Sequence, residues 1–333
     1  MEILLLQLKR IGDLLLTTPA IVAVREHFPA ATISLVVAPG CRELLPAIAG
    51  VDRTLVAGPS AWWAIARRRF DCCIDFSHND RSAFLALLSR ARQRITAQYV
   101  QLQSKLRARS YNIFVDAPLH LLHTVDYHLA LLRPLGIEHA GQRLQLRLTE
   151  TARRNAERIL SDAGIRGEFL LLHPGSARIE KFWVPERWSA LVDFADARQL
   201  ACVVTGASAP LEQAHIAEIQ TSSRSPFVDL SGRLDLLTLA AIIERARLLV
   251  TVDSAPAHLA AALQTPQIAL FGPTNPLHWR PRFSPALVLQ AGNTTPSTEF
   301  FPDRPPVPMN QISTAQVIDG MEAILATPRD TPV

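Results

Sequence analysis

The sequence predicts an α/β fold of two doubly wound domains that face a central cleft. Short apolar, β-branched runs alternate with helix-like segments along the whole chain, which is the pattern of parallel sheets. The length of 333 residues suits two domains of ordinary size. The composition shifts near residues 140 to 152, so we expect domains at 1–150 and 151–333.

The first half repeats strand and helix. A basic, irregular stretch covers residues 99–124, and Pro19 is expected to kink or restart the first helix. The expected strands are 3–8, 32–38, 54–57, 72–76 and 94–98, and the expected helices are 14–28, 41–49, 61–70, 82–92 and 125–134.

The second half repeats the pattern after a polar helix at 151–164. A proline-rich segment leads to a last helix at 313–326, for which packing back on the N-terminal domain is left open. The expected strands are 169–173, 201–206, 226–232, 248–252, 267–271 and 286–290, and the expected helices between them are 185–197, 207–220, 234–246 and 257–263.

Composition describes a folded chain with a large core. Hydrophobic residues make up 48% and charged residues 19%, and the net charge of +4 suits a phosphorylated ligand or an anionic surface without singling out nucleic acid. The four cysteines show no metal-ligand spacing and are expected to be reduced and buried. No leader or spanning segment is expected, which predicts a cytoplasmic protein, at most peripheral on a membrane.

The segment 248–276 predicts a βαβ unit with a ligand site at its strand ends. Asp253 and Ser254 follow a buried strand, and either side chain can accept from the free N–H groups of the next helix. Pro256 suits the first turn of that helix. Ligands with phosphates bind at this place in open parallel sheets.

Four strand-end loops in the second half combine small residues with hydroxyls: HPGS, TGAS, VDSAPAH and FGPT. Such loops let backbone amides approach phosphate oxygens closely. The chain has neither a GxGxxG fingerprint nor a P-loop, so we expect no dinucleotide cofactor and no P-loop hydrolysis. The candidate residues of these loops are Gly175, Ser176, Gly206, Ser208, Asp253, Ser254, Ala255, His258, Gly272 and Thr274.

Three further residues have a functional and a structural interpretation. Lys181 can reach a diphosphate as a point charge or can be a solvated lysine before a helix, and the sequence does not decide between these. Asp13 is by itself a helix cap, although Gly12 beside it makes a role at the presumed cleft plausible. His258 is by itself a packed or capping histidine.

Five segments resemble glycosyltransferase family 9, the ADP-heptose:lipopolysaccharide heptosyltransferases, over nearly the full length. Two departures are Ala255, where the family usually has Gly, and the lack of a cysteine-rich segment near Gly292–Pro306. The segments are RIGDLLLTTPAI, FDCCIDFSHNDRSAFLALL, HPGSARIEKFWVPERW, VVTGASAPLE and TVDSAPAHLAAALQTPQIALFGPTNP.

The resemblance implies a GT-B fold of two Rossmann-like domains, with the acceptor on the N-terminal domain and the nucleotide-sugar donor on the C-terminal one. By similarity Asp13 is the catalytic base and Lys181 binds the donor diphosphate. The candidate residues of the four strand-end loops form the donor site, and Ser176, Asp253, Ser254 and His258 among them fall on donor-binding motif positions. The expected reaction passes a heptose from ADP-heptose to a lipopolysaccharide core acceptor with inversion. Domain closure would bring Asp13 to the acceptor hydroxyl. The expected acceptor-binding residues are Arg10, Gly12, Asn79, Arg81 and Arg107.

The chemistry fits this assignment without a metal. Inverting sugar transfer needs one carboxylate base, while amides, hydroxyls and a lysine stabilise the leaving diphosphate. No D-x-D pair or other carboxylate cluster stands at a strand end, so metal-independent catalysis is expected. The alternatives are another nucleotide-sugar donor, a non-catalytic sugar-nucleotide or glycolipid binder, and a sugar-nucleotide epimerase of similar fold.

Between Asp80 and Asp116 every charged residue is basic. A solvated helix face accounts for any one of them, whereas the group could meet the phosphates of a lipopolysaccharide core or an anionic membrane. The residues are Arg81, Arg90, Arg92, Arg94, Lys105, Arg107 and Arg109.

Overall fold

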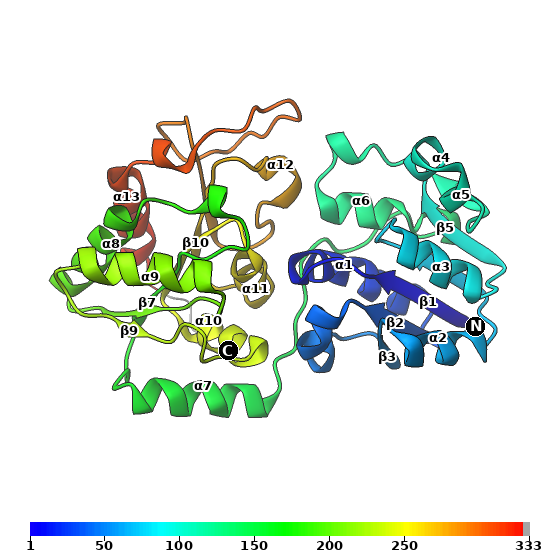
Figure 1. The fold of residues 1–333 in the computed structure, drawn as a ribbon, viewed down its shortest axis with the longest axis horizontal. Helices are drawn as coiled ribbons and strands as arrows, with labels where there is room; N and C mark the ends of the chain where they lie inside the picture. Colours follow the sequence, from blue (N-terminus) through cyan, green and yellow to red (C-terminus); the bar gives the residue numbers. More distant parts are fainter. Residues whose placement is uncertain (329–333) are drawn as a thin grey trace. The chain divides into compact units, whose positions relative to one another are not determined.

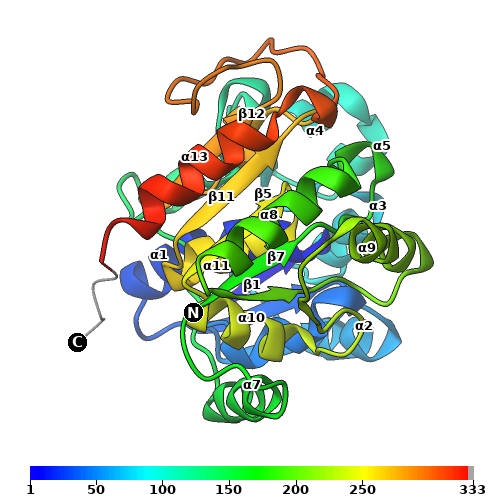
Figure 2. The ribbon, with the colours of Figure 1, turned by 90° about the vertical axis from the view of Figure 1, so that its left-hand side faces the viewer.

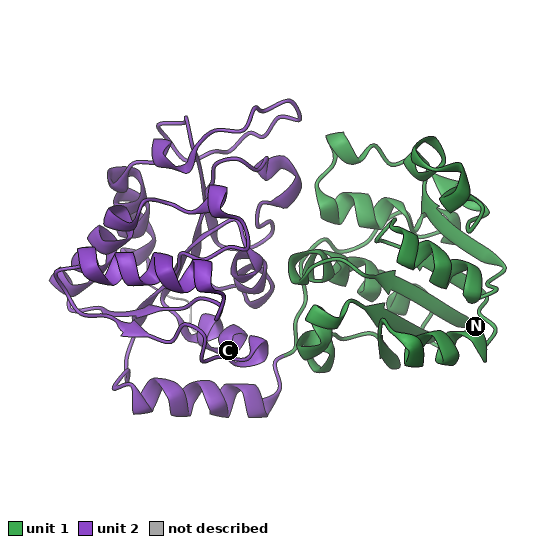
Figure 3. Cartoon of the chain, viewed as in Figure 1, with its two compact units in different colours: residues 1–147 green, residues 148–333 purple. Residues whose placement is uncertain are grey.

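The computed structural model describes residues 1–328, and residues 329–333 at the end of the expected second domain lie outside the described part. The chain divides into two compact units after Arg147 (Figure 3). This division falls within the stretch where the composition shifts. Each unit contains a six-stranded sheet in which all paired strands are parallel.

The first unit has the strand order β3-β2-β1-β4-β5-β6. The side chains of α2, α3 and α4 pack with the strands in one apolar cluster, and α1 contacts α6 (Figure 1). The strands are β1 (Glu2–Gln7), β2 (Thr32–Val37), β3 (Arg53–Val56), β4 (Cys72–Asp75), β5 (Gln93–Ala97) and β6 (Ile113–Val115). The helices are α1 (Ile11–His27), α2 (Pro59–Ala66), α3 (Asp80–Leu88), α4 (Tyr99–Gln103), α5 (Lys105–Ala108) and α6 (Thr124–Ala130), with 3₁₀ turns η1 (Pro39–Ala47), η2 (Leu119–Leu121) and η3 (Arg133–Leu135).

The second unit repeats this order as β12-β11-β10-β7-β8-β9. Its strands are β7 (Phe169–His173), β8 (Ala201–Val204), β9 (Val228–Asp229), β10 (Leu248–Val252), β11 (Gln267–Phe271) and β12 (Ala286–Gln290). Its helices are α7 (Glu150–Asp162), α8 (Pro185–Ala197), α9 (Pro210–Ser222), α10 (Leu236–Arg245), α11 (Ala255–Leu263), α12 (Pro276–Trp279) and α13 (Thr314–Leu325), with 3₁₀ turns η4 (Ile179–Lys181) and η5 (Met309–Gln311).

Helices cover both faces of the second sheet. The side chains of α8, α9 and α13 share one apolar cluster with the strands, and Figure 2 shows these helices in front of the sheet. On the other face α10 contacts α7 and α11. Val317 and Met321 of α13 are fully buried in this core, so the last helix packs on its own unit.

The sequence-based assignment is confirmed for most elements and wrong in three places. Pro19 lies inside the continuous helix α1, so it does not restart the helix. The stretch 99–124 contains α4, α5 and the short strand β6. The segment expected as a helix near Cys41 is the 3₁₀ turn η1. All four cysteines are free and buried, as expected.

Both sheets reverse their strand order at one central pair, which fixes where a ligand can bind. Counted within each unit, the order is 3-2-1-4-5-6, with the reversal between β1 and β4 and between β7 and β10. In doubly wound sheets ligands bind outside the carboxyl ends of such a pair. Within residues 1–328, no helix is long and apolar enough to cross a membrane.

Candidate functional site

The expected donor-site residues gather at one edge of the second sheet. Strands β8, β7, β10 and β11 are neighbours in that order, and their carboxyl ends meet at the same edge because all are parallel. Gly175, Ser176 and Lys181 follow β7; Gly206 and Ser208 follow β8; Asp253, Ser254, Ala255 and His258 follow β10; Gly272 and Thr274 follow β11. The strand reversal therefore lies at the centre of this set.

An ion pair spans the reversal point of the second sheet. Lys181 Nζ lies 2.6 Å from Asp253 Oδ2 and 3.0 Å from the Asp253 backbone oxygen. The two side chains are only 13% and 8% exposed. Thr274 Oγ1 donates to the same Oδ2 at 2.7 Å. The solvated-lysine interpretation of Lys181 is therefore wrong, and the ammonium group is held where β7, β10 and β11 end.

The N-cap side chain does not cap the backbone N–H groups at the amino end of α11. Ser254 is its N-cap residue without a side-chain cap, and its Oγ instead donates to Val252 O at 3.2 Å. The expected capping by Asp253 or Ser254 is wrong, because Lys181 and Thr274 hold the Asp253 carboxylate. A helix start without a side-chain acceptor and with a cation beside it favours a bound anion.

Two histidines at this edge are buried. His173 ends β7, and its Nδ1 lies 3.0 Å from Thr205 Oγ1. Burial lowers the pKa of His173 to about 4, so this ring is neutral near pH 7 and adds no charge to the edge. His258 on α11 is 4% exposed. The cation identified at this edge is Lys181, which is paired with Asp253, and the positive end of the α11 dipole lies beside it.

The loop glycines are required by the protein itself. A Cβ on Gly175 would lie 2.0 Å from Oε2 of Glu212, a buried carboxylate that accepts from Ala207 N at 2.8 Å. A Cβ on Gly272 would lie 2.5 Å from the sulfur of Met309. The sequence reasoning explained these glycines by close phosphate approach and missed Glu212, whose only sequence signal is its place in the VVTGASAPLE segment.

We expect Gly175→Ala to destabilise the second unit by about 2 kcal/mol and lower its Tm by roughly 4–8 °C, since Glu212 must give up its bond to Ala207 N. Differential scanning calorimetry measures this. Gly167→Ala is the matched control, because its Cβ meets nothing within 4 Å. The double change Gly175→Ala with Glu212→Ala relieves the clash, and an unchanged Tm for Gly175→Ala alone contradicts the packing argument.

The second unit has a pocket of about 650 Å³ whose lining includes Glu180 and Phe182 but not Lys181 between them. It lies between η4, α9 and the segment 306–310, and Glu180, Phe182 and Pro273 contribute to its wall. Phe182 stacks on His215 at 4.5 Å between ring centroids, which gives that wall an aromatic surface. Among residues 1–328 no three His, Cys, Asp or Glu side chains are grouped to hold a metal.

The first unit places Asp13 at its own reversal point. Asp13 lies in the first turn of α1, directly after β1, and its Oδ2 accepts from Arg10 N at 3.2 Å. This contact is the helix cap that the structural interpretation of Asp13 predicts. It uses only Oδ2 of the two carboxylate oxygens. Arg10 is exposed and Gly12 is half-buried at the same helix start.

The loop after β4 is built on the buried carboxylate of Asp75. It accepts from Ser77 N at 2.7 Å, from His78 N at 3.2 Å and from Ser82 Oγ at 2.7 Å, and Tyr111 also donates to it. Burial raises the pKa of Asp75. Sequence reasoning missed this residue because a carboxylate within an apolar strand gives no signal of its distant donors.

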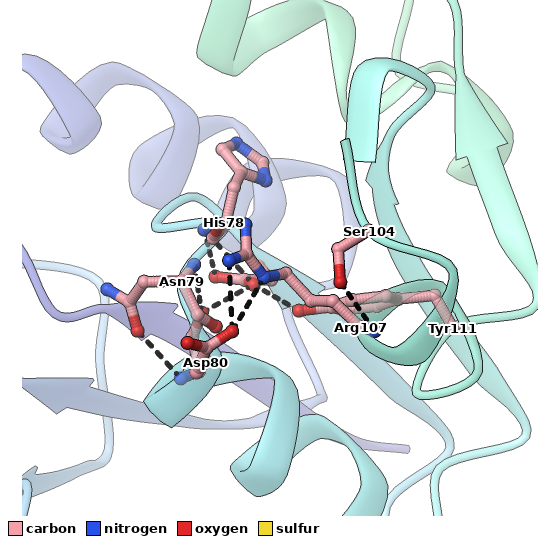
Figure 4. Close-up of polar contacts among 8 residues, drawn as sticks. His78, Asn79, Asp80, Ser104, Arg107 and Tyr111 are labelled. Atoms are coloured by element: carbon pink, nitrogen blue, oxygen red, sulfur yellow. Dashed lines mark hydrogen bonds and ion pairs between the residues drawn. The ribbon is translucent and has the colours of Figure 1, made fainter. Parts of the chain in front are cut away.

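Two of the residues expected to bind the sugar acceptor hold this same loop in place. Arg107 donates to Asp80 Oδ1 at 3.0 Å and to His78 O at 2.8 Å, as Figure 4 shows. Asn79 caps α3 through a bond of 3.0 Å from Ser82 N. Arg81, by contrast, is exposed. Ser77 Oγ accepts from Leu8 N at 2.6 Å, which ties this loop to the loop that precedes Asp13.

Comparisons with known proteins agree with the geometry. Lipopolysaccharide heptosyltransferase 3 of Escherichia coli is 29% identical over 329 residues, 94% of this chain and 96% of the relative. A lipopolysaccharide core heptosyltransferase of Haemophilus influenzae is 22% identical over 83% of this chain and 80% of its own length.

Solved structures show the same fold. A family 9 glycosyltransferase of Veillonella parvula matches with a TM-score of 0.85 and 23% identity, over 98% of this chain and 97% of that one. The E. coli ADP-heptose lps heptosyltransferase II matches at 0.79 with 19% identity, over 98% and 99%. The expected α/β fold of the GT-B class is therefore confirmed. The model of glycosyltransferase family 9 (heptosyltransferase) matches residues 60–300. The chain belongs to this family and is a glycosyltransferase.

Proposed function

We propose that this enzyme transfers a heptose from ADP-heptose to a lipopolysaccharide core acceptor with inversion. The observation that carries the proposal is the Lys181–Asp253 ion pair at the amino end of α11, which forms a site for a diphosphate. The names of the relatives support the sugar and the acceptor class. E. coli heptosyltransferase structures with ADP and with ADP-2-deoxy-2-fluoro heptose support the donor.

In the proposed mechanism Asp13 takes the proton of the acceptor hydroxyl as that oxygen attacks the anomeric carbon. The bond from this carbon to the diphosphate breaks as the new glycosidic bond forms on the opposite face. Lys181 and the amides of α11 stabilise the negative charge that develops on the leaving ADP. Arg10, Gly12 and Arg81, together with the loop that Asn79 and Arg107 shape, form the acceptor side. Ser176, Gly206, Ser208, Ala255, His258 and Gly272 complete the donor side.

The reaction is placed on the cytoplasmic side, at the surface of the inner membrane. Four free, buried cysteines suit a reducing compartment. Because the proposed acceptor is a glycolipid, we propose that the enzyme makes peripheral contact with the membrane.

Calorimetric titration with ADP, UDP and GDP tests the donor assignment. We expect ADP to bind at least tenfold more tightly than the other two nucleotides, by about 1.4 kcal/mol or more. A preference for UDP or GDP would keep the fold and replace the sugar donor. Tight ADP binding without turnover over a panel of core acceptors would favour the non-catalytic binder.

Removal of divalent cations is expected to leave catalysis intact, because Lys181 and the helix terminus supply the positive charge that a metal would otherwise give. Initial rates of ADP release are compared in excess EDTA and in added Mg²⁺. Rates within about twofold of one another are expected. A loss in EDTA that Mg²⁺ restores contradicts metal-independent transfer.

A further inference from the structure

Two helices of the first unit expose a continuous apolar surface. On α2, Trp62 is 44% and Trp63 is 67% exposed, and on α3, Phe84 is 48% and Leu87 is 55% exposed. The rings of Trp62 and Phe84 meet edge to face at 5.6 Å between centroids, which joins the two helices. We name these four residues the α2–α3 surface. The helices lie side by side on the same face of the sheet (Figure 1).

The two helices pack on the sheet through other residues than these four. The inner face of α2 buries Ala61 and Ile65, and the inner face of α3 buries Leu85 and Ala86. Surface helices usually carry polar residues on the outer face. Four large apolar side chains there mark a surface that contacts something else.

The charges around the α2–α3 surface are strongly basic. From Arg67 to Arg109 the chain has ten Lys and Arg residues and three Asp residues. Asp75 is buried, Asp80 pairs with Arg107, and Asp71 accepts from a backbone N–H. The exposed cations are Arg67, Arg68, Arg69, Arg81, Arg90, Arg92, Lys105 and Arg109.

Not every basic residue of this segment is available for a partner. Arg90 donates to the backbone oxygen of Ala66, and Arg94 donates to Ser110 O at 2.7 Å. Arg107 holds the loop after β4. The cations with no such structural task include the run of three that directly follows α2, next to Trp63.

We propose that the α2–α3 surface docks the enzyme on an anionic lipid bilayer. A bilayer offers both chemistries that this surface needs, an apolar layer for the rings and acidic headgroups for the guanidinium groups. Tryptophan favours this boundary, and arginine keeps its charge in the headgroups while its stem lies along apolar surface. The inference deepens the peripheral membrane contact of the proposed function, on which it rests, by assigning that contact to named residues of two helices.

A second copy of the chain fits this surface less well. A two-fold contact would bring the same patch of both copies together. The exposed arginines around the α2–α3 surface of one copy would then face those of the other. Like charges at such an interface are repulsive. An anionic surface instead neutralises them, so charge complementarity favours the lipid.

Vesicle flotation with the full chain tests the proposal without any sugar donor, so its failure is separate from failure of the proposed reaction. Wild type is expected to float with vesicles of phosphatidylcholine mixed with phosphatidylglycerol, less with phosphatidylcholine alone, and less in high salt. Trp63→Ser with Leu87→Ser should reduce partitioning roughly tenfold. A similar loss is expected when Arg67, Arg68 and Arg69 are changed to Gln.

Variants of the same kind in the second unit serve as controls. Phe283→Ser removes an apolar side chain that is 50% exposed in the second unit, and Arg154→Gln with Arg166→Gln removes two exposed charges there. Both are expected to float as wild type does. Equal flotation of the surface variants and wild type, or no flotation of wild type, overturns the proposal.

Two further outcomes also overturn it. Sedimentation that shows a dimer for wild type and a monomer for Trp63→Ser with Leu87→Ser assigns the surface to a second copy. The second outcome comes from a turnover assay. The surface variants should lose rate with vesicle-embedded acceptor and keep it with detergent-solubilised acceptor, and equal loss with both acceptors assigns the surface to catalysis.

Discussion

Asp13→Asn is expected to lower turnover by about 100- to 10,000-fold, the usual contribution of a general base. The asparagine keeps an oxygen for the capping bond from Arg10 N but cannot take the acceptor proton. Stability and ADP affinity should therefore stay near the wild-type values. Initial rates of ADP release, the Tm and a calorimetric titration separate these effects.

The matched control for this variant is Glu150→Gln. Glu150 is also a carboxylate in the first turn of a helix, on α7, and it is exposed. Its change should leave turnover unaltered, since it only weakens a favourable charge at a helix terminus. If Asp13→Asn retains turnover within about threefold of wild type, the structural cap is its whole role and another base must be found.

Lys181→Met is expected to weaken ADP binding by roughly 10- to 100-fold, the usual range for a lost bond to a charged group. The same change leaves the Asp253 carboxylate buried without its cation, at a cost of about 3 kcal/mol in the free energy of unfolding. A loss of binding from this variant alone is therefore ambiguous between a ligand contact and a disturbed site.

The double change Lys181→Met with Asp253→Asn resolves the ambiguity. The buried charge disappears with its partner, and the asparagine oxygen still accepts from Thr274 Oγ1. We expect stability to return close to wild type while ADP affinity stays low. Full recovery of ADP affinity in the double variant would mean that Lys181 only neutralises Asp253 and does not bind the diphosphate.

The sequence predicts the two sheets well because their strands are nearly continuous apolar runs, as strands buried on both faces must be. Leu248–Val252 and Gln267–Phe271 are buried throughout and are found where they are expected. Strand β6 has only three residues and lies in a basic stretch, so periodicity gives too short a signal to detect it.

The site is less predictable because its side chains choose partners far away in the chain. Capping by Asp253 is the local expectation, yet Lys181, 72 residues earlier, competes successfully for the carboxylate. Asp75 and Glu212 are fixed by contacts that only folding creates. Residue type and loop position predict which strand ends carry chemistry, whereas the pairing between loops depends on the sheet order.

The most direct test of the central claim is a transfer assay with ADP-heptose and a lipopolysaccharide core acceptor, followed by mass and anomeric configuration of the product. The account predicts a glycolipid heavier by one heptose, one ADP released per transfer and inversion at the anomeric carbon. It also predicts that Asp13→Asn forms this product about 100- to 10,000-fold more slowly. Retention of configuration, or free heptose released without transfer to the acceptor, would contradict it.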